Sequence, residues 1–166
     1  EEFDPDLDQM LFYLPLSGST FKKIYYDGGV NRAVSKFVPS DDLVVPYNAT
    51  NLEQAERVTH VIRKSENEIR KLQVSGFYRD IQIKPMDLED RIQEKENEIS
   101  GVKKVGYVDD EYTLLEIHAN LDIPGFETED GIKLPYIVTI DEGSGKVLSV
   151  YRNYKENDDT LKKIQY

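Results

Sequence analysis

The residues best suited to acid–base or metal chemistry are the two histidines and the carboxylates near one of them. His60 lies in the run THVIR and His118 in the run EIHAN, and both runs are typical of strands. Because alternate residues of a strand share a face, Glu116 and His118 can be neighbours. With Asp122 they would form a hydrolase or transferase site. No H-x-H or H-x-x-x-H spacing supports a metal site, so we favour a hydrogen-bonded structural pair.

The stretch TIDEGSGKVLS, residues 139–149, contains a glycine followed by a lysine, as phosphate-binding loops do. Such a loop needs G-x-x-x-x-G-K-[ST] and must open a helix. Here Lys146 is followed by Val147, Ile140 stands where the first glycine is required, and a strand pattern follows. The sequence therefore predicts a turn between two strands at Gly145, without a bound nucleotide.

Other catalytic and cofactor patterns are incomplete. Asp4, Asp6 and Asp8 have the spacing that begins a calcium-binding EF-hand loop, but Gln9 and Pro15 occupy the positions of its glycine and its bidentate glutamate. The chain has no cysteine and no G-x-S-x-G motif. The sequence therefore predicts a protein that is not an enzyme and holds no metal or cofactor.

The eleven tyrosines suggest contacts with other proteins instead. Several lie beside arginine, and tyrosine and arginine are both enriched at protein–protein interfaces. The candidate interface residues are Tyr25, Tyr26, Tyr78, Arg79, Tyr151, Arg152 and Tyr154.

The first half of the chain predicts a helix, a hairpin and a second helix. Asp4 can cap a helix over residues 5–14, in which Leu7, Met10, Leu11 and Leu14 form one apolar stripe. Strand-like runs on either side of a Gly-Gly pair at positions 28 and 29 predict a tight hairpin, and further extended runs include DDLVVPY and RVTHVIR.

Residues 65–105 contain two further helical patterns. Ser65 and Glu68 have the spacing of a capping box, which predicts a helix that ends at Gly76 and buries Ile69 and Leu72. Residues 86–105 predict a peripheral helical insert with a thin stripe of leucine and isoleucine.

The last third predicts three strands, and its final residues suggest a helix capped by Asp159. The runs LPYIVTID and KVLSVYRNY are close enough to form an antiparallel hairpin. The order of helix, strands, helices and strands predicts an α+β fold, with antiparallel hairpins, short peripheral helices and a single domain over residues 1–166.

Charge and length limit the possible partners. The formal net charge is −11, which opposes tight binding of a nucleic-acid backbone. No run of about 20 apolar residues is present, so we expect no membrane partner. The first residue is not Met and the end has no polar tail, so we expect a piece of a longer polypeptide.

Several segments taken together resemble the central part of portal proteins of tailed bacteriophages, most closely those of short-tailed phages and related prophages. The segments are LPLSGSTFKKIYYD, FVPSDDLVVPYNATNLEQAERVTHVIRKSENEIRKLQVSGFYRD and LPYIVTIDEGSGKVLSVYRNY. The resemblance extends from about Phe3 to Tyr166 and lies in the succession of segments, because no single motif is diagnostic.

The resemblance implies a structural role. Portal subunits form a ring, usually of twelve copies, at one capsid vertex, where terminase, scaffold and capsid proteins and tail adaptors bind and double-stranded DNA passes through the channel. This chain would be the outward-projecting wing region, present in the host cytoplasm during assembly and then in the virion. Two alternatives stay open: another virion adaptor of the tail or baseplate, and the hydrolase-type site at Glu116, His118 and Asp122.

Overall fold

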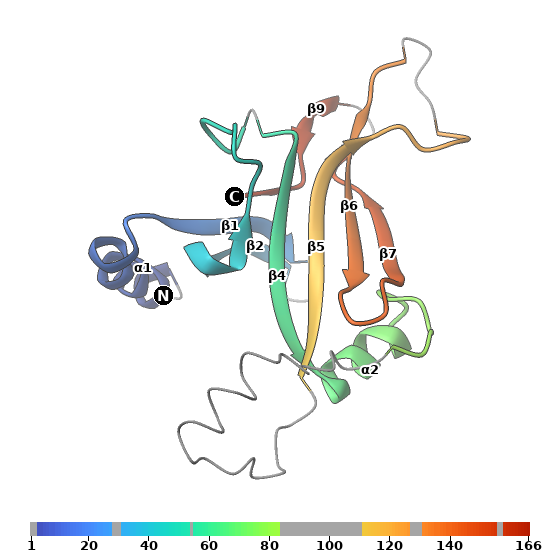
Figure 1. The fold of residues 1–166 in the computed structure, drawn as a ribbon, viewed down its shortest axis with the longest axis horizontal. Helices are drawn as coiled ribbons and strands as arrows, with labels where there is room; N and C mark the ends of the chain where they lie inside the picture. Colours follow the sequence, from blue (N-terminus) through green and yellow to red (C-terminus); the bar gives the residue numbers. More distant parts are fainter. Residues whose placement is uncertain (1–2, 28–30, 54, 84–110, 127–130, 156–157) are drawn as a thin grey trace, which may run out of the picture. The chain divides into compact units, whose positions relative to one another are not determined.

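The computed structural model describes residues 3–27, 31–53, 55–83, 111–126, 131–155 and 158–166. In these parts the chain forms antiparallel sheets and two α-helices, so the predicted α+β class is confirmed (Figure 1). The predicted helical insert over residues 86–105 and the Gly-Gly pair of the first hairpin lie outside the described residues.

Helix α1 spans Phe3–Ser17 and is longer than the sequence predicts, because Pro15 lies inside it. Proline is tolerated there at the cost of one backbone bond: it has no N–H to donate to the carbonyl of Leu11. The helix ends before Gly18, whose N–H bonds to the carbonyl of Leu14 at 2.9 Å and whose φ is 78°. Neither described helix is long and apolar enough to cross a membrane.

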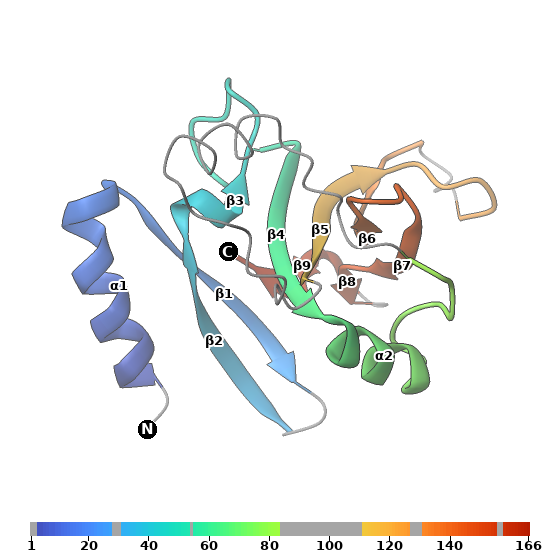
Figure 2. The ribbon, with the colours of Figure 1, turned by 60° about the horizontal axis from the view of Figure 1, so that its bottom comes forward.

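A three-stranded sheet follows α1, with strand order β10-β1-β2. Strands β1 (Thr20–Asp27) and β2 (Arg32–Pro39) form the predicted hairpin in an unbroken antiparallel register from Thr20–Pro39 to Asp27–Arg32. On the other edge, β10 (Ile164–Gln165) pairs with β1. Helix α1 lies along the hairpin (Figure 2), where the ring of Tyr13 stacks on that of Phe37 with centroids 5.6 Å apart.

A five-stranded sheet has the order β3-β4-β5-β6-β7. Its strands are β3 (Leu43–Val44), which follows the 3-10 turn Ser40–Asp42, β4 (Arg57–Ser65), β5 (Glu111–Leu121), β6 (Leu134–Asp141) and β7 (Val147–Arg152). The strand-like runs of the sequence therefore form strands as predicted, and β6 and β7 are sheet neighbours.

Helix α2 spans Glu66–Val74 and begins with the predicted capping box. The Ser65 amide donates to Glu68 Oε2 at 3.1 Å, which satisfies a backbone group that the helix leaves unpaired. The helix buries Ile69, packs Leu72 against the same cluster, and is followed by Gly76 at a φ of 77°.

The end of the chain differs from the prediction, because it forms strands and not a helix capped by Asp159. Strand β8 (Tyr154–Lys155) pairs with β9 (Asp158–Lys162), and β10 follows. The Asn153 side chain, just before β8, bonds to the backbone at the start of β10. Its amide nitrogen donates to the carbonyl of Ile164 at 3.1 Å, and its oxygen accepts from the Ile164 amide at 2.8 Å. These long-range bonds override a weak local helix tendency.

The chain divides into two compact units: Glu1–Val61, Glu116–Val138 and Val150–Tyr166 form the first, and Ile62–Leu115 and Thr139–Ser149 the second. The core of the first contains Val38, Leu43 and Val58, with Phe21, Leu52, Ala55 and Tyr166 packed against them. The core of the second contains Ile69, Tyr78, Tyr112, Leu114 and Leu148. Each unit thus has an apolar cluster of its own.

Candidate functional site

A buried polar network in the first unit brings together residues that are far apart in the sequence. Glu116 Oε1 accepts hydrogen bonds from the Lys23 ammonium, from His118 Nε2 at 2.7 Å and from the Tyr166 hydroxyl at 3.1 Å. The side chains of Lys23, Glu116 and His118 are at most 14% exposed. Water therefore screens this network little, and its members hold one another in place.

Regular backbone geometry explains how the network forms. Glu116 and His118 are two residues apart on β5, so they share one face of the strand, as the sequence predicts. Lys23 comes from the middle of β1, and Tyr166 directly follows β10, the strand that pairs with β1. The ring of His60, from β4, lies edge-on to that of Tyr166 with centroids 5.7 Å apart.

The network keeps Glu116 ionised. Burial alone raises the pKa of a carboxyl group, but the hydrogen bond from His118 and the Lys23 charge outweigh this and lower the pKa of Glu116 to about 2. Burial and the nearby Lys23 charge lower the pKa of His60 to about 4, so this ring is neutral at pH 7. Burial and the Glu116 charge raise the pKa of Tyr166, which stays protonated and donates.

This arrangement is poor for proton transfer from a substrate. A general base works best with a pKa near the working pH, whereas Glu116 is a weak base whose oxygen is already occupied by three donors. A cavity of about 290 Å³ lies beside the network, lined among others by His118, Asn153 and Tyr166. The geometry therefore best supports a structural role, in which the network holds Tyr166 against β5.

The predicted hydrolase-type set does not assemble. Glu116 and His118 are in contact, but Asp122 is exposed after the end of β5 and is not among the residues that line the cavity. Among the described residues, no group of three or more histidine and acidic side chains could hold a metal ion. The sequence analysis missed Lys23 and Tyr166. Nothing in the residues around either of them indicates that its side chain is buried against Glu116.

The glycine-rich stretch of residues 139–149 forms the predicted turn between β6 and β7. The Gly145 amide donates to the carbonyl of Asp141 at 2.8 Å, and the Ser144 amide donates to Asp141 Oδ2 at 3.0 Å. Gly145 has a φ of 67°, which glycine adopts without strain. Lys146 Nζ donates to the carbonyl of Gln82 at 2.6 Å, so the ammonium group is hydrogen-bonded to the backbone of this chain.

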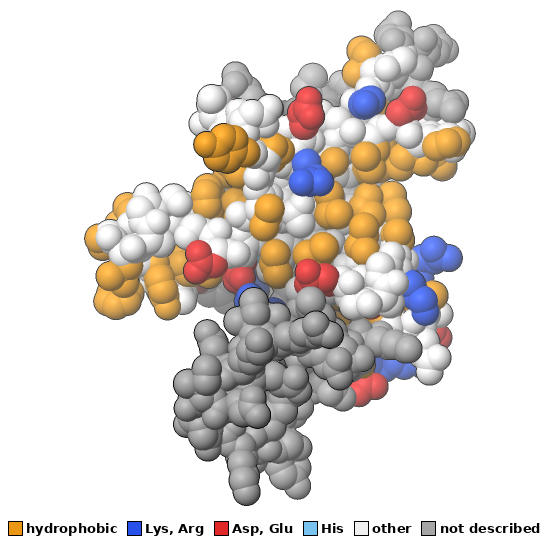
Figure 3. All heavy atoms as spheres, viewed as in Figure 1, with side chains coloured by type: hydrophobic (Ala, Val, Ile, Leu, Met, Phe, Trp, Pro, Cys, Tyr) orange, Lys and Arg blue, Asp and Glu red, His pale blue; other side chains and the backbone are white. Residues whose placement is uncertain are grey.

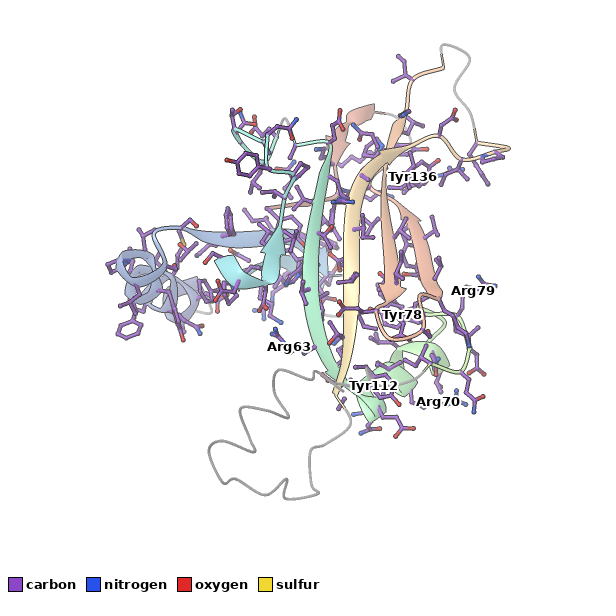
Figure 4. The ribbon with its side chains drawn as sticks, viewed as in Figure 1. Arg63, Arg70, Tyr78, Arg79, Tyr112 and Tyr136 are labelled. Atoms are coloured by element: carbon purple, nitrogen blue, oxygen red, sulfur yellow. The ribbon has the colours of Figure 1, made fainter. Side chains whose placement is uncertain are left out.

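The tyrosine and arginine candidates fall into different environments. The prediction is wrong for Tyr78, which is 5% exposed and belongs to the core of the second unit, next to Tyr112 (Figure 4). Arg79 is exposed and points away from α2 in the same view. The alternating faces of a strand could not predict which of the two is buried, because both lie in an irregular segment after α2.

The remaining candidates lie in the first unit. Tyr26 is exposed and its hydroxyl bonds to the side chain of Asn31, whereas Tyr25 is half-buried. Arg152 is exposed, with its guanidinium group 5.0 Å from the ring centroid of Phe126. The other two, Tyr151 and Tyr154, are exposed and half-buried respectively.

A different apolar surface is more extensive than these clusters. Leu11, Phe12 and Leu16 of α1 are 56%, 67% and 71% exposed. With Asp8 they follow the spacing i, i+3, i+4 and i+8, so the four residues share one side of the helix. Figure 3 shows hydrophobic side chains exposed over this helix. We call Asp8, Leu11, Phe12 and Leu16 the α1 surface.

The predicted apolar stripe of α1 is therefore only partly correct. Leu7 and Met10 are half-buried, whereas Leu11 and Leu14, which share their side of the helix, are 56% and 39% exposed. The sequence signal was the apolar run MLFYLPL, which covers every side of the helix. Large exposed apolar patches are uncommon on monomeric proteins, so this surface is a candidate for association.

No protein-family model matches the chain, and no curated protein matches it in sequence.

Proposed function

We propose that the chain is a structural, non-catalytic domain of a ring-forming portal protein of the tailed-phage type. The observation that carries the structural role is the α1 surface, which leaves Leu11, Phe12 and Leu16 in water. Monomeric proteins rarely expose contiguous apolar patches, and larger ones mark association sites. The portal assignment is supported by the succession of resembling segments, which include β1 and the β6–β7 hairpin.

The buried network supports a structural role as well. Glu116 has a low pKa and accepts three hydrogen bonds, an arrangement that suits tying β1, β5 and Tyr166 together more than turnover. The net charge of −11 suits a surface past which double-stranded DNA moves without binding. In this proposal ATP hydrolysis belongs to the terminase, and the domain has no cofactor.

The proposed setting is the portal vertex of the virion, with assembly in the host cytoplasm. The full-length protein would form a homo-oligomeric ring, with twelve subunits as the expected number, and would contact terminase, scaffold or capsid proteins and a tail adaptor. This chain would be the wing region of each subunit.

Electron microscopy of the full-length polypeptide tests the proposal. We expect closed rings with a central channel, and antibody against this chain should label particles at one vertex where head and tail meet. Label along the tail or at its tip would instead indicate a tail or baseplate adaptor. A full-length polypeptide that stays monomeric and is missing from purified particles would refute both virion roles.

A further inference from the structure

We propose that the α1 surface of one copy packs against a second surface, at the C-terminal end of α2, on another copy of this chain. This inference rests on the proposed ring and names the surfaces that join its neighbouring subunits. The contact would be head-to-tail, because two different surfaces meet and each copy carries both.

The α1 surface has apolar and acidic groups. Leu11, Phe12 and Leu16 supply apolar area, and Asp8 lies one turn before Leu11 and Phe12 on the same side. The residues Phe3–Ser17 include three aspartates and no lysine or arginine. Three carboxylates without a neighbouring cation in the helix make this side of the molecule acidic.

The second surface has the complementary character. Val74 is 77% exposed at the end of α2, and Phe77 is 48% exposed just after it. Lys71 is exposed and lies one turn before Val74. We call Lys71, Val74 and Phe77 the α2 surface.

The neighbouring charges leave the α2 surface basic. Arg70 lies one turn before Val74 and pairs with Asp80, with Arg70 Nη1 2.5 Å from the carboxylate oxygen Oδ1. The two charges of this pair offset each other, so Lys71 gives the surface its positive sign.

Charge decides which surfaces can meet. Two α1 surfaces would bring acidic residues together without any cation from either helix, and two α2 surfaces would bring cations together; both pairings are repulsive. An α1 surface against an α2 surface instead pairs Asp8 with Lys71 and buries apolar side chains from both. Heterologous contacts of this kind generate rings when the rotation closes.

Complementary knock-out variants of the 166-residue chain test the contact. Phe12→Asp disables only the α1 surface, and Val74→Asp disables only the α2 surface. In sedimentation velocity we expect the unaltered chain to associate with increasing concentration and each variant alone to stay monomeric. A mixture of the two should form a dimer and nothing larger, because one intact surface remains on each partner.

A charge exchange tests the pairing more closely. Asp8→Lys and Lys71→Glu should each raise the dissociation constant, by roughly tenfold for a loss of about 1.4 kcal/mol. The double variant with both exchanges should recover much of the affinity. Tyr47→Asp is the matched control, since Tyr47 is fully exposed and lies in neither surface.

Each other outcome counts against the contact. An unaltered chain that stays monomeric at the highest attainable concentration overturns it, as does a mixture of knock-outs that stays monomeric. Rings of full-length protein that persist with Phe12→Asp would reject this contact and leave the portal proposal standing. Head-to-tail association of the chain without any full-length ring would retain the contact and reject the portal role.

Discussion

The Tyr166 hydroxyl donates a hydrogen bond to Glu116 Oε1 at 3.1 Å, although the two residues are 50 positions apart. Tyr166 also packs its ring edge-on against those of His60 and His118 and contacts the core of the first unit. One side chain therefore joins the end of β10 to β4 and β5. The stability of this unit should depend on the contacts of that residue.

Removing only the hydroxyl of Tyr166 tests this dependence. Tyr166→Phe keeps the ring contacts but leaves Glu116 with one donor fewer. Because hydrogen bonds to charged groups contribute more than neutral ones, we expect a loss of about 1–2 kcal/mol in the free energy of unfolding, measured with urea. Tyr47→Phe, at a fully exposed position, should change nothing. Equal stability of Tyr166→Phe and the unaltered chain would show that the bond is not formed in solution.

Removing only one partner of the buried Lys23–Glu116 ion pair should lower the free energy of unfolding strongly. Glu116→Gln leaves the Lys23 ammonium group buried without an anion, and we expect a loss of about 3 kcal/mol at pH 7. The double variant Lys23→Met with Glu116→Gln should recover most of it, because the glutamine oxygen still accepts from His118 and Tyr166. Additive losses in this double-mutant cycle would contradict the pairing.

An exposed ion pair provides the control for that cycle. Lys64 Nζ lies 3.8 Å from Glu68 Oε1, and both side chains reach solvent. Glu68→Gln removes the charge but keeps a side chain that can complete the capping box. It should leave the urea midpoint nearly unchanged, since exposed pairs contribute little.

Acid should destabilise the chain in two steps. The pKa of His60 is about 4 in the folded protein against an ordinary 6.5, so stability is lost as pH falls from 6.5 towards 4. The pKa of Glu116 is about 2 against 4.5, so a further loss, of about 3 kcal/mol when complete, follows between pH 4.5 and 2.

Variants separate these two steps from the titration of other carboxylates. His60→Gln should flatten the pH dependence of the urea midpoint between pH 6.5 and 4, and Glu116→Gln should flatten it below 4.5. Both curves are compared with that of the unaltered chain. Parallel curves for His60→Gln and the unaltered chain would mean that His60 is not shielded from protonation.

The turn between β6 and β7 offers a prediction with a control two residues away. Gly145→Ala places a side chain at a φ of 67°, and we expect a loss of about 1 kcal/mol in the free energy of unfolding. Gly143 is not among the described glycines with positive φ, so Gly143→Ala should have little effect. Thermal unfolding of both variants measures the difference. Equal effects would show that the turn adopts another conformation.

Local signals predicted most of the regular structure correctly. The capping box at Ser65, the strand-like runs that contain His60 and His118, and the Gly-Ser-Gly turn each involve residues within a few positions of one another. They can be read without the rest of the fold, because hydrogen bonds and side-chain faces over such distances follow from helix and strand geometry. The contact of Glu116 with His118 was predictable for the same reason.

The signals failed where distant segments compete with local ones. The segment after Asn153 has a weak helix pattern, but the Asn153 side chain and the edge of β1 offer it strand partners. Tyr78 and Arg79 are neighbours with opposite burial, which depends on the cluster around Ile69 and not on their own types.

The sequence by itself determined the α+β class, the positions of α1, α2 and the long strands, and the acidic character of the chain. Only the tertiary structure decided that Lys23 and Tyr166 meet at Glu116, that the α1 surface stays exposed, and that the end of the chain forms strands. The physical reason is that burial and long-range pairing depend on which segments come together. No residue carries that information within its own neighbourhood.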